Sequence, residues 1–451
     1  MQKYILKNKD IDILSFECFV EQKQDKYGLD IRQIFQNITI LNADLLPLSL
    51  ALNNFDESEN GKALDKWIRR RKIPSHRRFA RDILAAAGID ESYLDSYISI
   101  SLGLSLNDSL WIVPADGDYK WQDFSLYENK FSEALQFAAF GVILPKSKHT
   151  GVSPELSTNG MLPKCWHRKN NQIYLYKGAA KMNGGADEPY SEFYMAQIAA
   201  VMGFECVPYD LGEFNGQLVS TCPIFTSENE GYLPIGYYLD KSERKYKGAE
   251  LASAIAKIYD KDKFEDLMLF DALVCNTDRH LGNFGFIVDN NANKILRPAP
   301  IFDNGLSLMS YVGFDELAHQ KKIISFITGY FDYNFDEQLK IFVKPRHIAN
   351  LEKLTGFEFK RHSEFNLSDE WLEPIQEYIQ DRARLAIQFA YEKQENSQKI
   401  KSSFRTDGSD STSLSSIRNE MLGSSTQQAD KQKPSVESDI DTNTGPKYPK
   451  R

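Results

Sequence analysis

Two polar segments joined by a hairpin pattern constrain this chain more than any other feature. The first segment places Asp278 five residues before Asn283. The second places Asp303 in an apolar-Asp-polar-Gly turn about 25 residues after Asp278. Between them, residues 284–288 and 294–296 predict two strands joined by a short polar turn. The pattern therefore predicts two polar loops that a single β-hairpin holds in register.

The polar groups in these loops are those that phosphoryl transfer requires. One carboxylate orients the attacking hydroxyl, while an amide and a second carboxylate hold the magnesium that bridges the nucleotide's phosphates. Mg²⁺ prefers hard oxygen ligands and usually takes only one or two carboxylates from a protein. We therefore expect Asp278 to be the catalytic residue and Asn283 and Asp303 to hold the metal. The alternative is that Asp278 and Asn283 only cap a turn, since Asn and Asp are common loop residues.

The first loop resembles a known family. Residues 276–283, Asn-Thr-Asp-Arg-His-Leu-Gly-Asn, resemble the catalytic loop of HipA-type serine/threonine kinases, in which an N-T-D-x-H-x-x-N string is typical. The D-R-H-x-x-N core is equally similar to the loop of phosphoinositide kinases, which share that kinase sub-fold. The resemblance covers about residues 100–395 and implies an α+β, bilobal protein-kinase-like fold that uses ATP and Mg²⁺. It places His280 at the loop backbone or the γ-phosphate, although a lone histidine is more often a packed structural residue.

Upstream of this loop, a strand and a helix supply two further charged residues. Lys177 ends an alternating run, residues 173–176, that predicts a strand. A strand lysine that reaches the nucleotide's phosphates, held by a helix carboxylate, is the usual kinase arrangement. We expect Ser191 to cap the next helix, which puts Glu192 in its first turn as the partner of Lys177. The alternative role of Glu192 is to stabilise the positive end of that helix.

The loop at residues 153–164 is expected to cover the nucleotide. It contains neither G-x-G-x-x-G nor a Walker A motif, which argues against a P-loop ATPase. Its backbone amides and hydroxyls suit an anion-binding nest, and an ordinary surface turn is the alternative. In HipA-type kinases a serine of this loop is autophosphorylated, so the resemblance implies Ser153 or Ser157 as the site here. The residues assigned to ATP in this loop, and in the segment at the position of a kinase hinge, are Ser157, Thr158, Asn159, Gly160, Ile224, Phe225 and Thr226.

The resemblance and the composition together divide the 451 residues into four expected regions. Residues 1–145 predict a separate amino-terminal α/β module, residues 146–226 a small lobe with its hinge, and residues 227–395 a large lobe. Residues 396–451 are rich in Ser, Thr, Asp, Gln and Lys with almost no aromatics, which predicts a disordered tail.

Local patterns predict three further elements. A helix is expected to start at Pro74 and to stop at Gly88. Residues 204–209 and 216–222 predict strands of the small lobe. Residues 371–389 predict an amphipathic closing helix.

Charge and cysteine usage limit the partners. The net charge of −9 argues against direct nucleic-acid binding by the whole chain. One dense basic run, Arg69 to Arg81, marks a contact with nucleic acid or an acidic partner, or else the solvated face of two helices, which we favour. Five scattered cysteines without C-x-x-C spacing suit a reducing cytosol. Because neither a span of about 18 apolar residues nor a signal-peptide pattern occurs, we expect a cytoplasmic protein with no membrane partner.

The expected function is an ATP- and Mg²⁺-dependent kinase that phosphorylates Ser or Thr of a protein substrate. The nearest alternative is a phosphoinositide-type lipid kinase, which needs a basic membrane-facing loop. After Asp303 the chain offers Lys321 and Lys322 but also Asp315 and Glu316, which is a poor match. A third alternative is a non-catalytic nucleotide-binding module that grips a partner. In the HipA family that partner is often a small DNA-binding antitoxin, so the resemblance implies such a partner and a toxin role.

Overall fold

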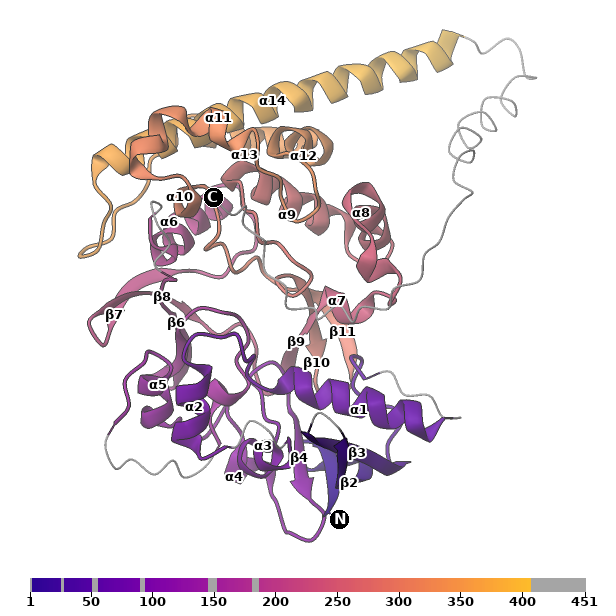
Figure 1. Ribbon diagram of the computed structural model, residues 1–451. Coiled ribbons are helices and arrows are strands. Elements are labelled where there is room, and N and C mark those ends of the chain that lie inside the picture. The colour runs from indigo at the N-terminus through magenta and orange to yellow at the C-terminus, as the bar shows by residue number, and fades with distance from the viewer. Residues whose placement is uncertain are drawn as a thin grey trace.

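The computed structural model shows an α+β protein whose sheets and helices lie in layers (Figure 1). In this view the amino-terminal sheet lies at the bottom, two smaller sheets lie in the middle, and most helices of the carboxyl-terminal half lie at the top. The expected α+β class is confirmed. The structure describes residues 2–25, 28–50, 56–89, 94–144, 152–180 and 186–406.

The amino-terminal region is built on a four-stranded antiparallel sheet of order β3-β2-β1-β4. The strands are β1 (Gln2–Asn8), β2 (Ile11–Asp25), β3 (Gly28–Ile40) and β4 (Leu110–Pro114). Its helices are α1 (Glu57–Arg71), α2 (Ala80–Ala87), α3 (Leu94–Ser101), α4 (Trp121–Phe124) and α5 (Glu133–Ala138). Helix α1 starts where Asp56 accepts a hydrogen bond from the amide of Glu59 at 3.1 Å, and it ends in three arginines that suit the negative helix end.

Two smaller antiparallel sheets form the middle of the molecule. One has the order β5-β6-β8-β7 and the other β11-β10-β9. Their strands are β5 (Lys164–Lys169), β6 (Gln172–Lys177), β7 (Asp210–Phe214), β8 (Gln217–Pro223), β9 (Glu230–Pro234), β10 (Gly285–Asp289) and β11 (Lys294–Pro298). The predicted hairpin is confirmed, because β10 and β11 pair antiparallel.

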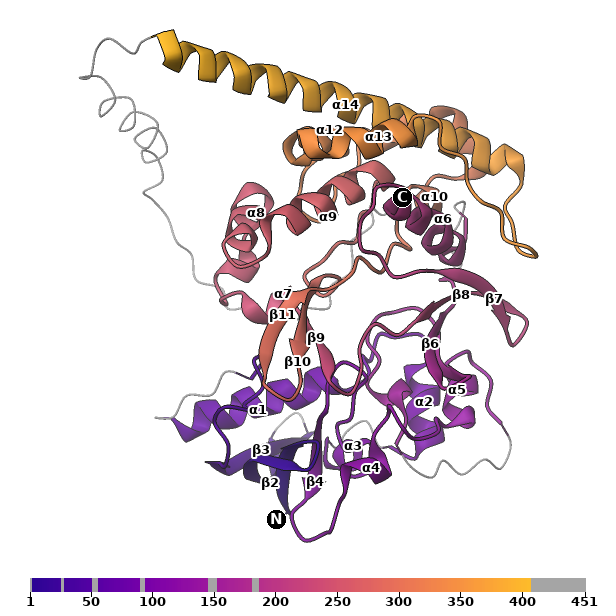
Figure 2. The ribbon, with the colours of Figure 1, turned by 180° about the vertical axis from the view of Figure 1, so that it is seen from behind.

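The upper layer is helical and contains the largest hydrophobic cluster. Its α-helices are α6 (Glu188–Val201), α7 (Ile235–Tyr238), α8 (Gly248–Ala256), α9 (Lys261–Val274), α10 (Leu308–Tyr311), α11 (Gln320–Ile324), α12 (Phe335–Phe342), α13 (Ile348–Leu354) and α14 (Asp369–Thr406). Its 3₁₀ turns are η2 (Glu243–Lys245), η3 (Phe314–His319) and η4 (Pro345–His347). Figure 2 shows from behind that α14 runs across α12 and α13. Helix α9, whose residues 267–274 are all buried, leads into the first polar loop. Within the described residues, no helix combines the length and apolar character that a membrane crossing needs.

The hydrophobic clusters cross the expected boundary at residue 145. The amino-terminal cluster includes Leu156, Cys165 and Val219, which belong to the segment expected to be the small lobe. A second cluster packs Trp111 and Ile173 together. The expected division into four regions stays a prediction. The amino-terminal hydrophobic cluster contains residues from both sides of residue 145.

Four local expectations differ from the structure. Helix α6 begins at Glu188 with Pro189 in its first turn, so Ser191 is not its cap and instead donates a hydrogen bond to the carbonyl of Asn304 at 3.0 Å. Helix α2 begins at Ala80 rather than after Pro74, because Phe79 takes a left-handed conformation at its start.

The other two differences concern residues 204–209 and the tail. Residues 204–209 form a single bridge, between Cys206 and Ile301, rather than a strand. Pro208 lacks an N–H, which keeps a ladder from continuing there. Helix α14 continues to Thr406, so residues 396–406 are helical and not disordered. The rest of the expected tail, 407–451, lies outside the described residues.

The basic run from Arg69 to Arg81 is partly internal. Arg71 is buried, stacks over Trp67 and forms two hydrogen bonds with Asp108 at 2.7 and 2.8 Å. Arg77 is also buried, with only 2% of its surface exposed. These two side chains are therefore not part of a solvated basic face.

Candidate active site

The loop after α9 closes on itself through backbone and amide contacts. Cys275 ends the helix with φ of 55°, which turns the chain sharply. The side-chain oxygen of Asn276 accepts from the amide of Asp278 at 2.9 Å. The side-chain nitrogen of Asn283 donates to the carbonyl of Asp278 at 2.9 Å. His280 Nδ1 accepts from a backbone amide two residues later, so this histidine braces the loop in the described conformation.

Arg279 joins this loop to the turn that carries Asp303. Its guanidinium forms a buried pair with Asp271 of α9, with Nε and Nη2 both 2.9 Å from carboxylate oxygens. It also donates to the carbonyls of Asn283 and Phe302. Asn283 is one of the two residues expected to hold the metal, and Phe302 directly precedes the other, Asp303. A planar group with five donors in a fixed fork suits this task, which a lysine would not perform.

Lys177 and Glu192 form the expected ion pair. Lys177, at the end of β6, lies 2.6 Å from Glu192 Oε1 and also pairs with Asp303. The other oxygen of Glu192 accepts from the backbone amide of Asn304 at 2.7 Å. Gly305 lies directly against this group, since a Cβ there would be 3.4 Å from Lys177 Nζ. Strand β6, helix α6 and the turn that carries Asp303 therefore meet at Lys177.

The two carboxyl groups of the site have opposite pKa shifts. Burial, and next the charge of Asp303, raise the pKa of Asp278 to about 7. Burial acts against ionisation of Asp303, but the charge of Lys177 holds its pKa well below the usual range. Burial also lowers the pKa of His280. Such a separation suits one carboxyl that takes up a proton beside another that stays ionised.

The donor set fits a magnesium ion that binds together with phosphates. Asn283 uses its amide nitrogen within the loop, which leaves its side-chain oxygen for a ligand. Asp303 pairs with Lys177 through Oδ1, which leaves Oδ2. Among the described residues, no group of three or more His, Cys, Asp or Glu side chains could hold a metal unaided. Mg²⁺ suits such a site, because it commonly takes one or two carboxylates and completes its shell with substrate phosphates and water.

The loop expected to cover the nucleotide is packed against the protein and forms hydrogen bonds within itself. It starts with the 3₁₀ turn η1 (Pro154–Leu156), and Ser153 and Ser157 are both buried. Ser153 donates to the carboxylate of Glu155, and Thr158 donates to the carbonyl of Pro154 at 2.7 Å. Phosphorylation of either serine therefore requires the loop to move. Asn159 is exposed, and Gly160 has φ of 92°, a conformation that favours glycine.

The expected hinge segment contacts the turn that carries Asp303 through aromatic rings. Phe225 packs against Phe302, with ring centroids 5.2 Å apart. The backbone amide of Ile224 donates to the carbonyl of Ile173 at 2.9 Å. The hydroxyl of Thr226 donates to the carbonyl of Leu106 at 2.6 Å, so it serves the amino-terminal region.

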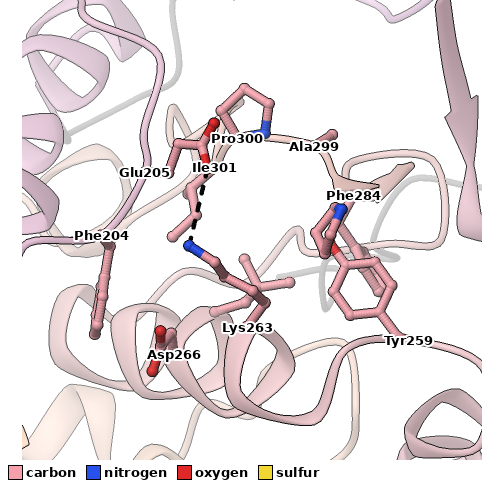
Figure 3. A pocket seen from close by; sticks show the side chains of 11 residues that line it. Phe204, Glu205, Tyr259, Lys263, Asp266, Phe284, Ala299, Pro300 and Ile301 are labelled. Carbon is pink, nitrogen blue, oxygen red and sulfur yellow. Dashed lines mark ion pairs between the residues drawn. The ribbon is translucent and has the colours of Figure 1, made fainter. Parts of the chain in front are cut away.

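A pocket on the other side of residues 298–301 is separate from this charged group. It is lined by Tyr259, Phe284 and Ile301, and an ion pair of 3.8 Å between Lys263 and Glu205 lies at its edge (Figure 3). Its walls include Phe284, which follows Asn283 in sequence, but none of the residues expected to bind ATP or metal.

Comparison with known proteins shows a sequence similarity to a kinase. The chain is 28% identical over 211 residues to the serine/threonine-protein kinase CtkA of Helicobacter pylori. The matched region is 42% of this chain and 61% of CtkA, so it spans less than two thirds of that relative. The matched relative is named as a kinase, which is the kind of protein that the catalytic-loop motif led us to expect. No protein-family model matches the chain.

Two solved structures show weak similarity to this chain. The crystal structure of CtkA aligns with a TM-score of 0.40 and 18% identity over 51% of this chain and 94% of that chain. The HipA chain of a Shewanella oneidensis complex with HipB and operator DNA aligns with a TM-score of 0.46 and 14% identity over 86% and 98%. Both scores are too low to support an argument about activity or partners.

Several residues that organise the site were not expected from the sequence. Asp271 and Asn304 hold Arg279 from two sides, and the hydroxyl of Tyr209 accepts from the amide of Asp303 at 2.9 Å. The only sequence signal for Asp271 is a charged residue within the buried stretch of α9. Such a residue requires a buried partner, which here is Arg279.

Proposed function

We propose that this protein is an ATP- and Mg²⁺-dependent kinase that phosphorylates Ser or Thr of a protein substrate. The observation that carries the proposal is the contact of Lys177 with both Glu192 and Asp303, near the half-buried side chain of Asp278. Phosphoryl transfer requires a cation for the phosphates, a carboxylate for the metal and a group that takes up a proton, and the proximity of Lys177, Asp303 and Asp278 supports these roles.

Each residue has a defined role in this proposal. Lys177 binds the phosphates, and Glu192 holds its ammonium in place. Asn283 and Asp303 hold Mg²⁺, which supplies positive charge to the phosphates when it is bound. Asp278 orients the acceptor hydroxyl and takes its proton, while the oxygen bonds to the γ-phosphorus and the bond to the β-phosphate oxygen breaks. Because Asp278 has a pKa of about 7, it is suited to proton transfer near neutral pH.

The acceptor class is decided by direct labelling. We expect radiolabelled ATP, Mg²⁺ and purified protein to label proteins in a cell extract and to leave extracted phosphoinositides unlabelled. Labelled lipid would support the phosphoinositide-kinase alternative. Nucleotide binding without labelled protein or lipid would support the non-catalytic module.

Two substitutions test the assigned roles. We expect Asp278→Ala and Asp303→Asn each to reduce the initial rate of phosphoryl transfer to below about one tenth of the wild-type rate, since such groups are worth several kcal/mol. Asp315→Asn, at an exposed position on η3, is the matched control and should keep the wild-type rate. Melting curves should show all variants folded. A rate above one tenth in either folded variant would contradict the assignment.

Cellular role and partners form a separate part of the proposal. We place the kinase in the cytoplasm, in line with its free cysteines, and assign it a small DNA-binding antitoxin-like partner as in HipA-type systems. Co-purification of such a protein from the native cell tests the partner. Its absence would leave the kinase chemistry untouched.

A further inference from the structure

A turn between α11 and α12 contacts the catalytic loop directly. The turn comprises residues 328–334, and an isolated β-bridge joins its two ends. Inside it, the amide of Gly329 donates to the carbonyl of Tyr333 at 3.0 Å. Gly329 also lies against the catalytic loop, since a Cβ there would be 3.7 Å from the carbonyl oxygen of Asn276. These contacts fix the position of Tyr330 beside that loop.

Tyr330 lies next to the residue expected to take the acceptor's proton. Its ring centre is 6.5 Å from that of His280 in the catalytic loop. Burial, and next the charge of Asp278, raise the pKa of its hydroxyl. The phenol is therefore close enough to Asp278 for the two groups to interact, and a substrate whose hydroxyl reaches Asp278 passes near Tyr330.

Lys247 holds a positive charge over Tyr330. Its Nζ lies 5.2 Å from the centre of the tyrosine ring. Lys247 is the residue directly before α8, and the next residue also touches the turn, since a Cβ on Gly248 would be 3.6 Å from the carbonyl oxygen of Phe331. The attraction between an ammonium and an aromatic face restrains this long side chain. The charge therefore has a defined place beside the turn.

The segment that leads into α8 is basic, although the whole chain has a net charge of −9. Residues 241–247 contain four basic side chains and one acidic side chain: Lys241, Arg244, Lys245 and Lys247, with Glu243. The three lysines are exposed. Among the described residues, Lys247 contacts Tyr330 but forms no ion pair. An exposed and restrained cation beside the acceptor position favours a substrate with negative charge near its acceptor.

The distances suit an acidic side chain close in sequence to the acceptor. Lys247 Nζ and the ring of His280 contact opposite partners of the same tyrosine ring, at 5.2 and 6.5 Å from its centre. An extended peptide advances about 3.3 Å per residue. The ammonium is therefore within about four residues of the point where a peptide reaches the catalytic loop.

We propose that Lys247 is a specificity-determining residue, which binds an acidic side chain of the protein substrate within about four residues of the acceptor Ser or Thr. The inference rests on the proposed function and adds a preference among its substrates. Tyr330 is a positioning residue, whose ring holds the ammonium of Lys247 beside the acceptor. Because like charges repel, acceptors flanked by Lys or Arg are disfavoured.

Mapping of phosphorylated sites tests this preference on proteins. Full-chain wild type, Lys247→Met, Lys247→Glu and Lys257→Met each act with Mg-ATP on a heat-treated, dephosphorylated cell extract, and mass spectrometry locates the phosphates. Lys257 is exposed at the other end of α8 and provides the matched control. We expect wild type and Lys257→Met to select sites with Asp or Glu near the acceptor. Lys247→Met should lose this preference, and Lys247→Glu should select Lys or Arg instead.

Synthetic peptides give the magnitude of the effect. One peptide copies the most strongly labelled wild-type site, and its variants replace each acidic residue by Ala. We expect the wild-type kcat/KM to fall about three- to fivefold for one of these replacements, as for an exposed ion pair, through a higher KM with kcat unchanged. Lys247→Met should show no such fall and should match wild type on the Ala peptide. Lys247→Arg and Tyr330→Phe should keep the preference, whereas Tyr330→Ala should reduce it.

The outcomes separate this inference from the proposed function. Equal site preference in wild type and Lys247→Glu would overturn the inference, as would wild-type sites that lack acidic neighbours. In both cases the labelled proteins would still support the kinase. Failure of the wild type to label protein would contradict the proposed function and the inference with it. Melting curves should show every Lys247 variant folded, because this side chain is exposed.

Discussion

Asp278, the proposed catalytic residue, has an electrostatic cost in the folded protein. Its side chain is half-buried, and burial together with the charge of Asp303 raises its pKa to about 7. The charges of Lys177 and Lys164 favour the ionised form but do not outweigh burial. A carboxyl that ionises with difficulty in the folded state stabilises that state only while it is protonated.

This cost predicts a pH-dependent effect of Asp278→Asn on stability. The folded pKa of Asp278 lies above that of an unfolded aspartate, so its contribution is present at low pH and is lost as pH rises toward about 7. We therefore expect the melting temperature of Asp278→Asn to approach that of wild type near pH 4 and to exceed it by about 2–4 °C at pH 8. Calorimetry without nucleotide measures both. Asp315→Asn is the exposed control, and a difference that stays constant with pH would contradict the buried carboxyl.

Single residues show what the sequence alone could and could not predict. The spacing of Asp278 and Asn283 predicted the polar loop, because the two residues lie close in sequence and contact each other within it. The pairing of Lys177 with Glu192 was predicted from the strand and helix patterns and the usual kinase arrangement, and the structure contains it. Arg279 and Arg77 were not expected to organise the site, because their partners lie elsewhere in the chain and only the fold brings them together.

At the scale of elements, the nucleotide loop is held by its own hydrogen bonds and by Arg77. Ser153 donates to Glu155, and Ser157 is buried beside Pro154. A phosphate on either serine adds about −1.5 to −2 charges that this packed conformation has no room for. Phosphorylation should therefore trap the loop away from the site.

We expect autophosphorylation at Ser157 or, failing that, at Ser153. Ser157→Asp should lose ATP binding at least about tenfold, as an added charge beside the phosphates requires, and Ser157→Ala should keep it. Mass spectrometry after incubation with Mg-ATP locates the phosphate, and calorimetry measures the binding. Phosphate found only within residues 396–451 would exclude self-inhibition by this loop and leave the kinase assignment intact.

The closing helix has a buried half and an extension. The last residue of α14 in the large hydrophobic cluster is Ala390, and Lys393 donates to the carbonyls of Ile341 and Val343. Truncation after Glu395 removes neither. We therefore expect the truncated protein to melt within about 1 °C of the full chain and to keep its rate, since the composition of the removed part predicts no core. A clear fall in melting temperature would show that residues 396–451 dock on the body.

Elements were predictable where local signals were strong. The hairpin β10–β11 has a polar turn between apolar runs, and helix α9 has an apolar pattern that ends at the loop. The start of α6 was misplaced because Ser191 looked like a cap, whereas Pro189 already lies in the first turn. Residues 204–209 have the apolar composition of a strand, but the structure forms only a single bridge there, between Cys206 and Ile301.

At the scale of the whole molecule, the amino-terminal region contacts both sides of the candidate site. Arg77 holds the nucleotide loop. On the other side, the carbonyl of Asn107 accepts from the amide of Tyr232 in β9 at 2.7 Å. Asn8 donates to the carbonyl of Asn290 at the β10–β11 turn. Figures 1 and 2 both show α1 beside this hairpin. The region therefore braces the site from two directions.

This arrangement predicts that the catalytic region does not fold alone. A fragment of residues 146–406 would expose Leu156, Cys165 and Val219, which pack only within the amino-terminal cluster, and would leave three loop carbonyls without Arg77. We expect it to aggregate or to lack a cooperative melting transition, whereas residues 1–406 melt cooperatively. Circular dichroism and limited proteolysis of both measure this. Within the full chain, Val219→Asp should lower stability by at least about 3 kcal/mol, because it buries a charge without a partner. Gln217→Asp, on the same strand but only partly buried, is the control. A 146–406 fragment that melts cooperatively near the wild-type temperature would show that the amino-terminal region is a separate domain.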